Sequence, residues 1–310
     1  MSGAQGAYTA DRAQPTSAPE GLSFGQAGGA GVSRGLGATP GNHAAQAGRL
    51  GWIPCVRIFG TEIHNIDLAQ AVDLISRAIE RGDRGYVVTP NVHHIVLLRH
   101  HPVFRAAYDG AALRLPDGTP LVWASRLLGR PLHGRVAGAD LLPALCRAAA
   151  SRGFSVFFAG GRAGVARQAA ERLARRLPGL RVAGTFTPAD DFAGNAKAAE
   201  EMVIAVNQAR PDLLFVGLGA PAQEVWVSRH WSRLKVPVAV CCGAALDFAA
   251  GTGRRAPAWV QGAGLEWLWR LVNEPRRLWR RYLVQDTAFL GMCIMELRTM
   301  RRAMLRKSGT

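Results

Sequence analysis

The feature that most constrains the fold is a regular alternation of short apolar runs and longer amphipathic stretches, which begins after Trp52. The apolar runs have the length of buried strands, and the amphipathic stretches have the length and spacing of helices that bury one face. Such alternation is typical of an α/β fold, a Rossmann-like and mostly parallel sheet with helices on both faces. The strands and helices expected, in chain order, are 56–58, 68–81, 86–89, 92–99, 112–115, 119–128, 155–159, 164–177, 181–186, 195–209, 213–217, 223–234 and 236–241.

The sequence on either side of this pattern has a different character. Residues 1–50 hold eleven glycines and eleven alanines without apolar periodicity, which predicts a disordered extension. Residues 51–255 carry the α/β pattern. After Arg255 the strand-like runs stop, and Pro257 and Pro275 stand where helices start, so residues 256–310 are expected to form a C-terminal helical appendage.

The chain has a formal net charge of +16, which implies attraction to nucleic acid, an anionic membrane surface or a phosphorylated substrate. From Arg254 to the end, twelve basic residues accompany only four acidic ones, and Trp267, Trp269 and Trp279 are interleaved with arginines. Arginine suits phosphate oxygens, and tryptophan prefers the boundary between water and lipid. The appendage is therefore predicted to meet an anionic phosphate at a membrane surface.

The cysteines and the hydropathy pattern favour a cytoplasmic protein. Five cysteines without CxxC spacing predict neither a zinc site nor a disulfide framework. No apolar run approaches the roughly 20 residues of a membrane-spanning helix, and the N-terminus lacks the apolar segment of a signal peptide. We therefore expect peripheral attachment to the inner face of the cytoplasmic membrane.

Glycines occur where expected strands turn into helices, a pattern that lets backbone N–H groups approach a diphosphate at a helix start. A tight strand-to-helix turn explains the same glycines without a ligand. In the second of these turns an amide and a carboxylate follow Pro221 and would point at a ligand from a first helical turn. The residues predicted to bind substrate in these turns are Gly160, Gly161, Gly217, Gly219, Gln223 and Glu224.

Polar side chains also follow two other expected strands. Thr89 and Asn91 end one strand, and their uncharged donors and acceptors suit a sugar or a uracil. Asp117 follows the next strand, although Asp-Gly is also a common turn pair. Ligands of open α/β sheets bind at the carboxyl ends of the strands, so these three residues are candidates for a binding site.

Two clusters could in principle hold a metal ion. His93, His94, His100 and His101 lie near one another in a helical stretch, but no acidic or thiolate residue follows at ligand spacing. The pair Asp190–Asp191 lies between Pro188 and Gly194, which favours a solvated loop. We predict neither a metal site nor a cofactor.

Seven motifs in order resemble the WecG/TagA/CpsF family of glycosyltransferases, over about Cys55 to Leu283. The motifs are Thr89-Pro-Asn91, Pro116-Asp-Gly118, Arg135-Val-Ala-Gly-Ala-Asp140, Phe158-Ala-Gly-Gly161, Val216-Gly-Leu-Gly-Ala-Pro-Ala-Gln-Glu224, Arg255-Ala-Pro257 and Gly264-Leu-Glu-Trp-Leu-Trp-Arg270. The resemblance implies an inverting, metal-independent transfer of a sugar from a UDP-sugar to a polyprenyl-diphosphate-linked acceptor. It also implies a nucleotide-binding α/β core whose site is completed by the appendage.

The resemblance also implies roles for single residues. Asp117 matches the general base, which would take the proton of the acceptor hydroxyl. Positive charge near the departing UDP would replace a metal ion. The remaining matches are Thr89, Asn91, Arg135 and Gln223 in the substrate pocket, and Arg270, Arg277 and Arg280 near the diphosphate.

Some positions differ from the family pattern. Ala222 stands where many members carry lysine, and His93 where related sequences often have an acidic residue. Residues 184–188, Gly-Thr-Phe-Thr-Pro, stand where the family pattern has a Gly-Tyr-Phe-like element. The donor therefore stays open among UDP-N-acetylmannosamine, its uronic acid and UDP-glucose.

Two other classes of protein fit parts of the sequence. The basic tail would suit a nucleic-acid-binding protein, but its mixture of tryptophan and leucine with arginine suits a lipid boundary better, so we expect no nucleic-acid partner. The glycine turns would suit a nicotinamide-dependent oxidoreductase, but the segment from Gly160 to Gly164 lacks the full GxGxxG fingerprint. A homo-oligomer is compatible with the sequence, which does not decide the active oligomeric state.

Overall fold

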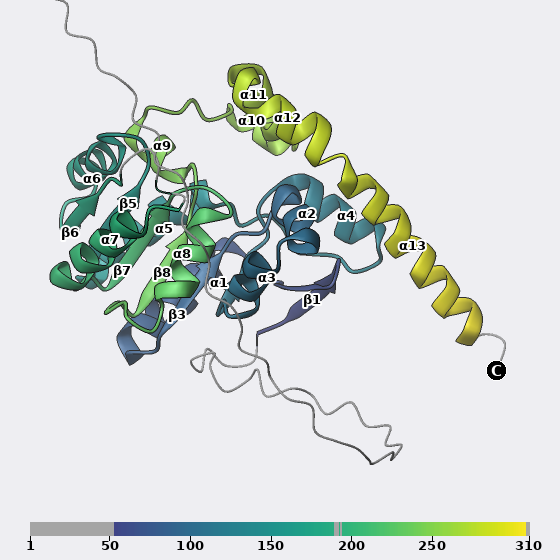
Figure 1. Cartoon of the computed structure of the whole chain (residues 1–310), viewed down its shortest axis with the longest axis horizontal. Helices are drawn as coiled ribbons and strands as arrows, with labels where there is room; N and C mark the ends of the chain where they lie inside the picture. The colour runs from purple at the N-terminus through teal and green to yellow at the C-terminus, as the bar shows by residue number, and fades with distance from the viewer. Residues whose placement is uncertain (1–52, 189–191, 193, 308–310) are drawn as a thin grey trace, which may run out of the picture. The chain divides into compact units, whose positions relative to one another are not determined.

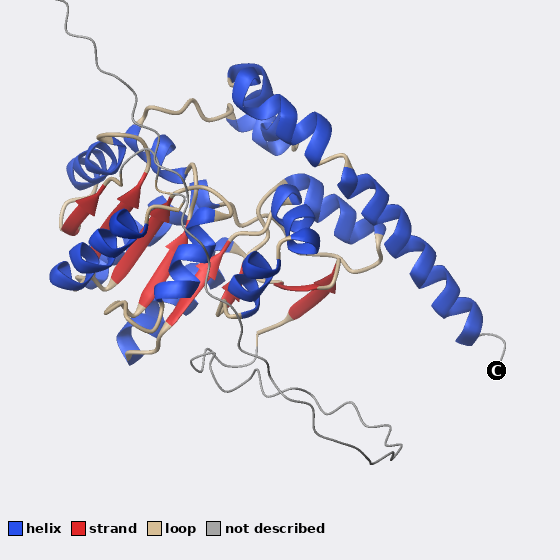
Figure 2. Ribbon diagram, in the orientation of Figure 1, coloured by secondary structure: helices blue, strands red, loops and turns tan. Residues whose placement is uncertain are grey.

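Six parallel strands form one sheet in the order β4-β3-β8-β7-β5-β6 (Figures 1 and 2). The computed structural model describes residues 53–188, 192 and 194–307, so the predicted extension over residues 1–50 lies outside the described residues. The strands are β3 (Gly85–Val88), β4 (Leu113–Arg114), β5 (Ser155–Gly160), β6 (Arg181–Phe186), β7 (Leu213–Gly217) and β8 (Val238–Cys241).

Helices cover both faces of the sheet, because alternate residues of the strands point into two different cores. In β5, Phe157 belongs to one apolar cluster and its neighbours Val156 and Phe158 to the other. The first cluster packs against α2 (Val92–His100), α3 (Pro102–Asp109), α4 (Thr119–Leu127), α7 (Ala196–Ala209) and α8 (Ala222–His230). The second packs against α1 (Leu68–Arg81), α5 (Gly138–Arg152), α6 (Val165–Arg176) and α9 (Ala245–Ala250).

The predicted strand over residues 56–58 lies outside the parallel sheet. It belongs to β1 (Cys55–Ile58), which pairs antiparallel with β2 (Thr61–His64) in a separate two-stranded sheet. The sequence analysis also missed β2, α3 and α5. Helix α5 begins in a stretch of small residues and contains Pro143, while α3 follows α2 directly, so neither has the clean boundaries that a sequence pattern needs.

Helices follow α9 to the end of the described chain. They are α10 (Ala258–Gly262), α11 (Glu266–Asn273), α12 (Pro275–Arg280), a π-helical turn η2 (Arg281–Gln285) and α13 (Ala288–Lys307). Pro257 and Pro275 stand at the starts of α10 and α12, as predicted. The predicted fold class, an α/β sheet with a C-terminal helical segment, is confirmed.

The last helix packs into the first of the two cores. Phe289, Met292 and Cys293 of α13 are buried in the same cluster as Ile58 and Phe59 of the hairpin. The rings of Phe59 and Phe289 lie 5.0 Å apart between centroids, and α13 also lies beside α2 (Figure 1). None of the helices in the described part of the chain is both long and apolar enough to cross a membrane.

The connections after the neighbouring strands β5 and β7 leave towards opposite faces of the sheet. The helix after β5, α6, packs against one core, and the helix after β7, α8, packs against the other. A crevice forms where such connections diverge, outside the carboxyl ends of the strands. The residues predicted to bind substrate all come from this edge or from the C-terminal helices.

Candidate active site at the carboxyl edge of the sheet

Asp117 lies where the loop after β4 meets the loop after β3. Its backbone N–H donates to the carbonyl oxygen of Pro90 over 2.8 Å, and the N–H of Val136 donates to the oxygen of Pro116 over 2.7 Å. The first bond ties Asp117 to the segment that carries Thr89 and Asn91. The second brings in the segment that carries Arg135.

The environment of Asp117 changes its acidity. Burial is the largest influence and raises the pKa of this carboxyl to about 6. Arg135 and Arg270 lower the pKa, whereas Glu266 and Asp140 raise it. A carboxyl group with this pKa is ionised at neutral pH and has a proton affinity suited to a general base.

Thr89 and Asn91 hold the neighbouring strand ends in place. Thr89 is buried, and its hydroxyl donates to the carbonyl oxygen of Cys241 at the end of β8 over 3.3 Å. Asn91 caps α2, because its side-chain oxygen accepts from the N–H of His94 over 3.2 Å. The structure thus brings Thr89, Asn91 and Asp117 together at the ends of the two adjacent strands β3 and β4.

Three of the four clustered histidines have local partners. His93 contacts Asp286 over 3.0 Å, and buried His94 contacts the hydroxyl of Tyr108 over 2.6 Å. The ring of His101 accepts from the N–H of Phe104 and caps α3. Among the described residues, no three His, Cys, Asp or Glu side chains gather as metal ligands would. Asp190 and Asp191 lie outside the described residues.

The glycines of the turns allow three loops to pack backbone to backbone. The N–H of Gly161 donates to the oxygen of Gly217 over 2.8 Å, and a Cβ on Gly160 would lie 2.5 Å from that oxygen. A Cβ on Gly217 would lie 2.5 Å from a methyl group of Leu246. Gly219 has a φ of +77° with open space around it. Packing between the turns is therefore sufficient to explain Gly160 and Gly217.

Gln223 and Glu224 are buried at the start of α8. The amide of Gln223 donates to Glu224 over 2.7 Å and accepts from the N–H of Gly243 over 3.0 Å. The pair thereby joins the turn after β7 to the turn after β8. Burial raises the pKa of Glu224 to about 7, and within the described structure its second oxygen has no hydrogen-bond partner.

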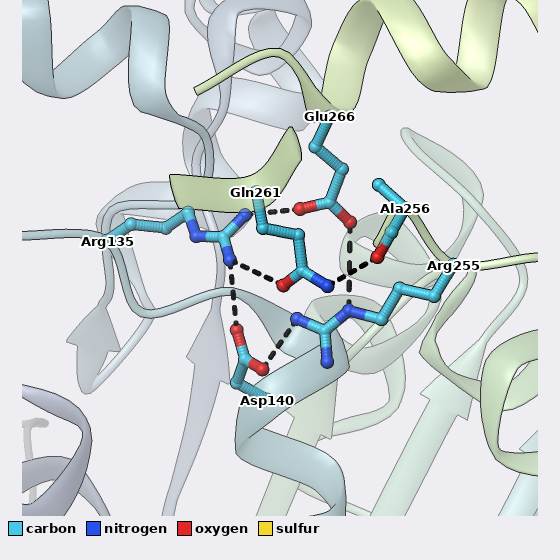
Figure 3. Close-up of polar contacts among 6 residues, drawn as sticks. All are labelled: Arg135, Asp140, Arg255, Ala256, Gln261 and Glu266. Atoms are coloured by element: carbon cyan, nitrogen blue, oxygen red, sulfur yellow. Dashed lines mark hydrogen bonds and ion pairs between the residues drawn. The ribbon is translucent and has the colours of Figure 1, made fainter. Parts of the chain in front are cut away.

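A network of opposite charges connects the start of α5 to the C-terminal helices (Figure 3). Arg135 donates to Glu266 and contacts Asp140 over 3.4 Å and Gln261 over 3.3 Å. Arg255 donates to Asp140 over 2.5 Å, and its Nε lies 3.8 Å from Glu266. Each of the two arginines thus contacts both carboxylates.

The three arginines predicted at the diphosphate have different surroundings. Arg270 is half-buried, lies 5.9 Å from the centre of the Phe248 ring, and its Nε has no hydrogen-bond partner among the described residues. Arg280 is exposed and lies 5.6 Å above the ring of Trp279. Arg277 belongs to α12, but its side chain lies outside the described part. Between the two arginines whose side chains are described, Arg270 acts on the pKa of Asp117.

The sequence analysis did not assign Asp140, Arg255, Gln261 or Glu266 to the site. Asp140, Arg255 and Glu266 belong to the seven motifs that carry the resemblance, and Gln261 lies between two of those motifs. Opposite charges in motifs far apart in sequence, Arg135 with Glu266 and Asp140 with Arg255, were the available signal.

Comparison with known proteins assigns the class of this protein. A model of the glycosyl transferase WecG/TagA/CpsF family matches residues 56–303, so the chain belongs to this family and is a glycosyltransferase. The resemblance and the enzyme class predicted from the motifs are confirmed.

Two relatives share the name N-acetylglucosaminyldiphosphoundecaprenol N-acetyl-beta-D-mannosaminyltransferase. The relative from Bacillus spizizenii is 33% identical over 66% of this chain and 77% of its own length. The relative from Staphylococcus aureus strain MW2 is 27% identical over 73% of this chain and 87% of its own length. Both similarities extend over most of the relative.

Proposed function

We propose that this protein transfers N-acetylmannosamine from a UDP-sugar to a polyprenyl-diphosphate-linked acceptor, with inversion and without a metal ion. The names of the two relatives support the sugar and the acceptor class. The observation that carries the chemistry is the Asp117 carboxyl, held at the carboxyl edge of the sheet beside Arg135 and Arg270. The uronic acid of this sugar and glucose are the alternative donor groups.

In the proposed step a hydroxyl oxygen of the acceptor attacks the anomeric carbon of the donor, from the side opposite UDP. The new carbon–oxygen bond forms while the bond from that carbon to the UDP oxygen breaks, which inverts the configuration. Asp117 takes the hydroxyl proton, and UDP leaves with the bonding electron pair. General-base assistance of this kind contributes about 10²–10⁴ in rate.

Arg270 is the candidate for stabilising the charge that develops on UDP. Its guanidinium Nε lacks a hydrogen-bond partner among the described residues, so the group retains a donor for a phosphate oxygen. Arg277 and Arg280 follow on α12, and we propose that they contact the diphosphate of the substrates as the resemblance implies. The buried turns around Gly160, Gly217 and Gln223 would contact the nucleotide from the side of the sheet.

The surface of the C-terminal helices supports attachment to a membrane, where a polyprenyl-linked acceptor resides. Trp259 is 73% exposed and Val272 is 71% exposed, and Trp279 is also exposed. Exposed Arg276 and Arg280 lie in the same segment. Interleaved aromatic, aliphatic and basic side chains suit an interface with anionic lipids. We propose a peripheral protein of the inner membrane face that contributes to surface polysaccharide synthesis.

The function is tested by measuring UDP release with a soluble polyprenyl-diphosphate-linked N-acetylglucosamine analogue. UDP-N-acetylmannosamine, its uronic acid and UDP-glucose are compared under identical conditions, with Asp117→Asn as the control. We expect acceptor-dependent release with the first donor. Release with none of the three donors, together with salt-sensitive binding of an oligonucleotide, would favour the nucleic-acid-binding alternative.

A further inference from the structure

Helix α11 is held against the rest of the protein mainly by polar contacts. All eight of its residues are described, and none of them is buried. Helix α13 differs, because Phe289, Met292 and Cys293 are buried in the core. Apolar burial therefore fixes α13, whereas it contributes little to the placement of α11.

The carboxylate of Glu266 supplies the main contacts at the start of α11. It accepts from Arg135, which precedes α5, and lies 3.8 Å from Arg255 (Figure 3). Only 17% of its side chain is exposed, so solvent screens these contacts less than those of a surface ion pair. Two residues earlier, a Cβ on Gly264 would lie 2.7 Å from Thr119 and Trp123 of α4, which shows how closely the chain approaches there.

The position of Glu266 determines where Arg270 lies. Residues four apart in an α-helix lie on one face, so Glu266 and Arg270 share the face of α11 that meets the sheet edge. Both charges act on Asp117, as do those of Arg135 and Asp140 from the start of α5. Fixing Glu266 at one end of this face therefore fixes the distance between Arg270 and Asp117.

We propose that Glu266 is a positioning residue for the transfer: by binding Arg135 and Arg255 it docks α11 at the carboxyl edge of the sheet and places Arg270 beside Asp117. This inference depends on the proposed function for its effect on turnover. The expected effect of Glu266 on the docking of α11 is independent of that function. The role is distinct from substrate contact, because the Glu266 carboxylate is occupied by arginines of the protein itself.

The test compares Glu266→Gln with Glu296→Gln. Glu296 of α13 also pairs with an arginine of the α/β part, since it lies 3.7 Å from Arg130, but it is not among the charges that act on Asp117. Three quantities are measured in the full-length chain: kcat/KM across pH, KM and kcat separately, and hydrogen exchange of the backbone over residues 256–274.

In Glu266→Gln we expect kcat/KM to fall by about tenfold or more, mainly through kcat, because small misplacements of a catalytic group carry costs of this order. The acidic limb of the pH profile should move to lower pH. The variant loses a negative charge and part of the burial, which both raise the pKa of Asp117, and these losses outweigh the loss of the smaller pKa-lowering influence of Arg270. Exchange over residues 256–274 should become faster. Glu296→Gln should change none of the three quantities.

Glu266→Asp separates the effect of the negative charge from the effect of side-chain length. It keeps the negative charge, so its pH limb should stay near that of the wild type, while the shorter side chain lowers kcat. The inference is overturned if Glu266→Gln behaves like Glu296→Gln in all three measurements. Absence of transfer in the wild type would refute the proposed function instead, and the exchange measurement alone would then decide whether Glu266 docks α11.

Discussion

The parallel sheet and the C-terminal helices contribute to the site in different ways. At the sheet edge, a backbone hydrogen bond fixes Asp117, while burial and a hydroxyl hydrogen bond to Cys241 fix Thr89. Helix α11 has no buried residue and presents Arg270 through contacts between opposite charges. The comparison teaches that the proposed base belongs to a tightly packed scaffold, while the proposed cation belongs to an element whose placement depends on a few ion pairs.

The largest effect is expected from Asp117→Asn, at the edge of the parallel sheet. The amide cannot take the acceptor proton, so kcat/KM should fall by at least about a hundredfold. The backbone contacts of Asp117 remain, so the melting temperature should change little. UDP release and a thermal melt measure the two quantities. Near-normal turnover in the folded variant would remove Asp117 from the role of base.

The next effect comes from the helical side, where Arg270→Ala and Arg280→Ala form a matched pair. Arg270 acts on Asp117, whereas Arg280 is exposed and stacks on Trp279. With a soluble acceptor we expect Arg270→Ala to lower kcat by about a hundredfold, as for the loss of one preorganised donor. Arg280→Ala should cost less. Equal losses would show that both arginines reach the leaving group.

A third prediction concerns the stability of the scaffold. The pKa of Glu224 is raised in the folded state to about 7, so its neutral form favours folding at low pH, and this contribution is lost as pH rises towards 7. Glu224→Gln stays neutral and should reduce the decline in the free energy of unfolding between about pH 4.5 and 7, by about 1–3 kcal/mol. Urea unfolding across pH measures this. An unchanged decline would mean that Glu224 does not titrate in this range.

Attachment to a membrane should depend on the helical side alone. Trp279→Ala should weaken binding to vesicles that contain anionic lipid, because an interfacial side chain is lost. Turnover of a soluble acceptor should remain within about twofold of the wild type, since Trp279 is exposed. Co-sedimentation with vesicles and UDP release separate the two effects. Parallel loss of both would place Trp279 in the active site.

The smallest effect is expected from removal of divalent metal ions. If Arg135 and Arg270 supply the positive charge of the site, EDTA should leave kcat/KM unchanged within error. Loss of activity that magnesium or manganese restores would contradict the metal-independent proposal. In that case Asp190→Asn and Asp191→Asn would be the first variants to examine.

The sequence predicted the sheet well, because β3, β5 and β7 are apolar runs that end at glycine or before a polar residue. The bounds of β6, β7 and α1 agree with the prediction. The strand over residues 56–58 was assigned to the wrong sheet, since a strand pattern does not show which strand is its partner. The contacts of Glu266 were missed because Arg135 lies far away in the sequence, and Gln223 was expected to face a ligand although its amide is bonded to Gly243 and Glu224.

The order of the strands has a consequence for synthesis of the protein. β8 is the last strand to leave the ribosome, yet it lies between β3 and β7 in the middle of the sheet. A nascent chain that ends before Val238 therefore holds two separate half-sheets, β4-β3 and β7-β5-β6, each with an apolar edge open to pairing. Only a chain that extends past Cys241 can close this gap, and α13 later covers Phe59. Closure of the sheet must wait until β8 has been made, a period in which chaperones would protect both edges.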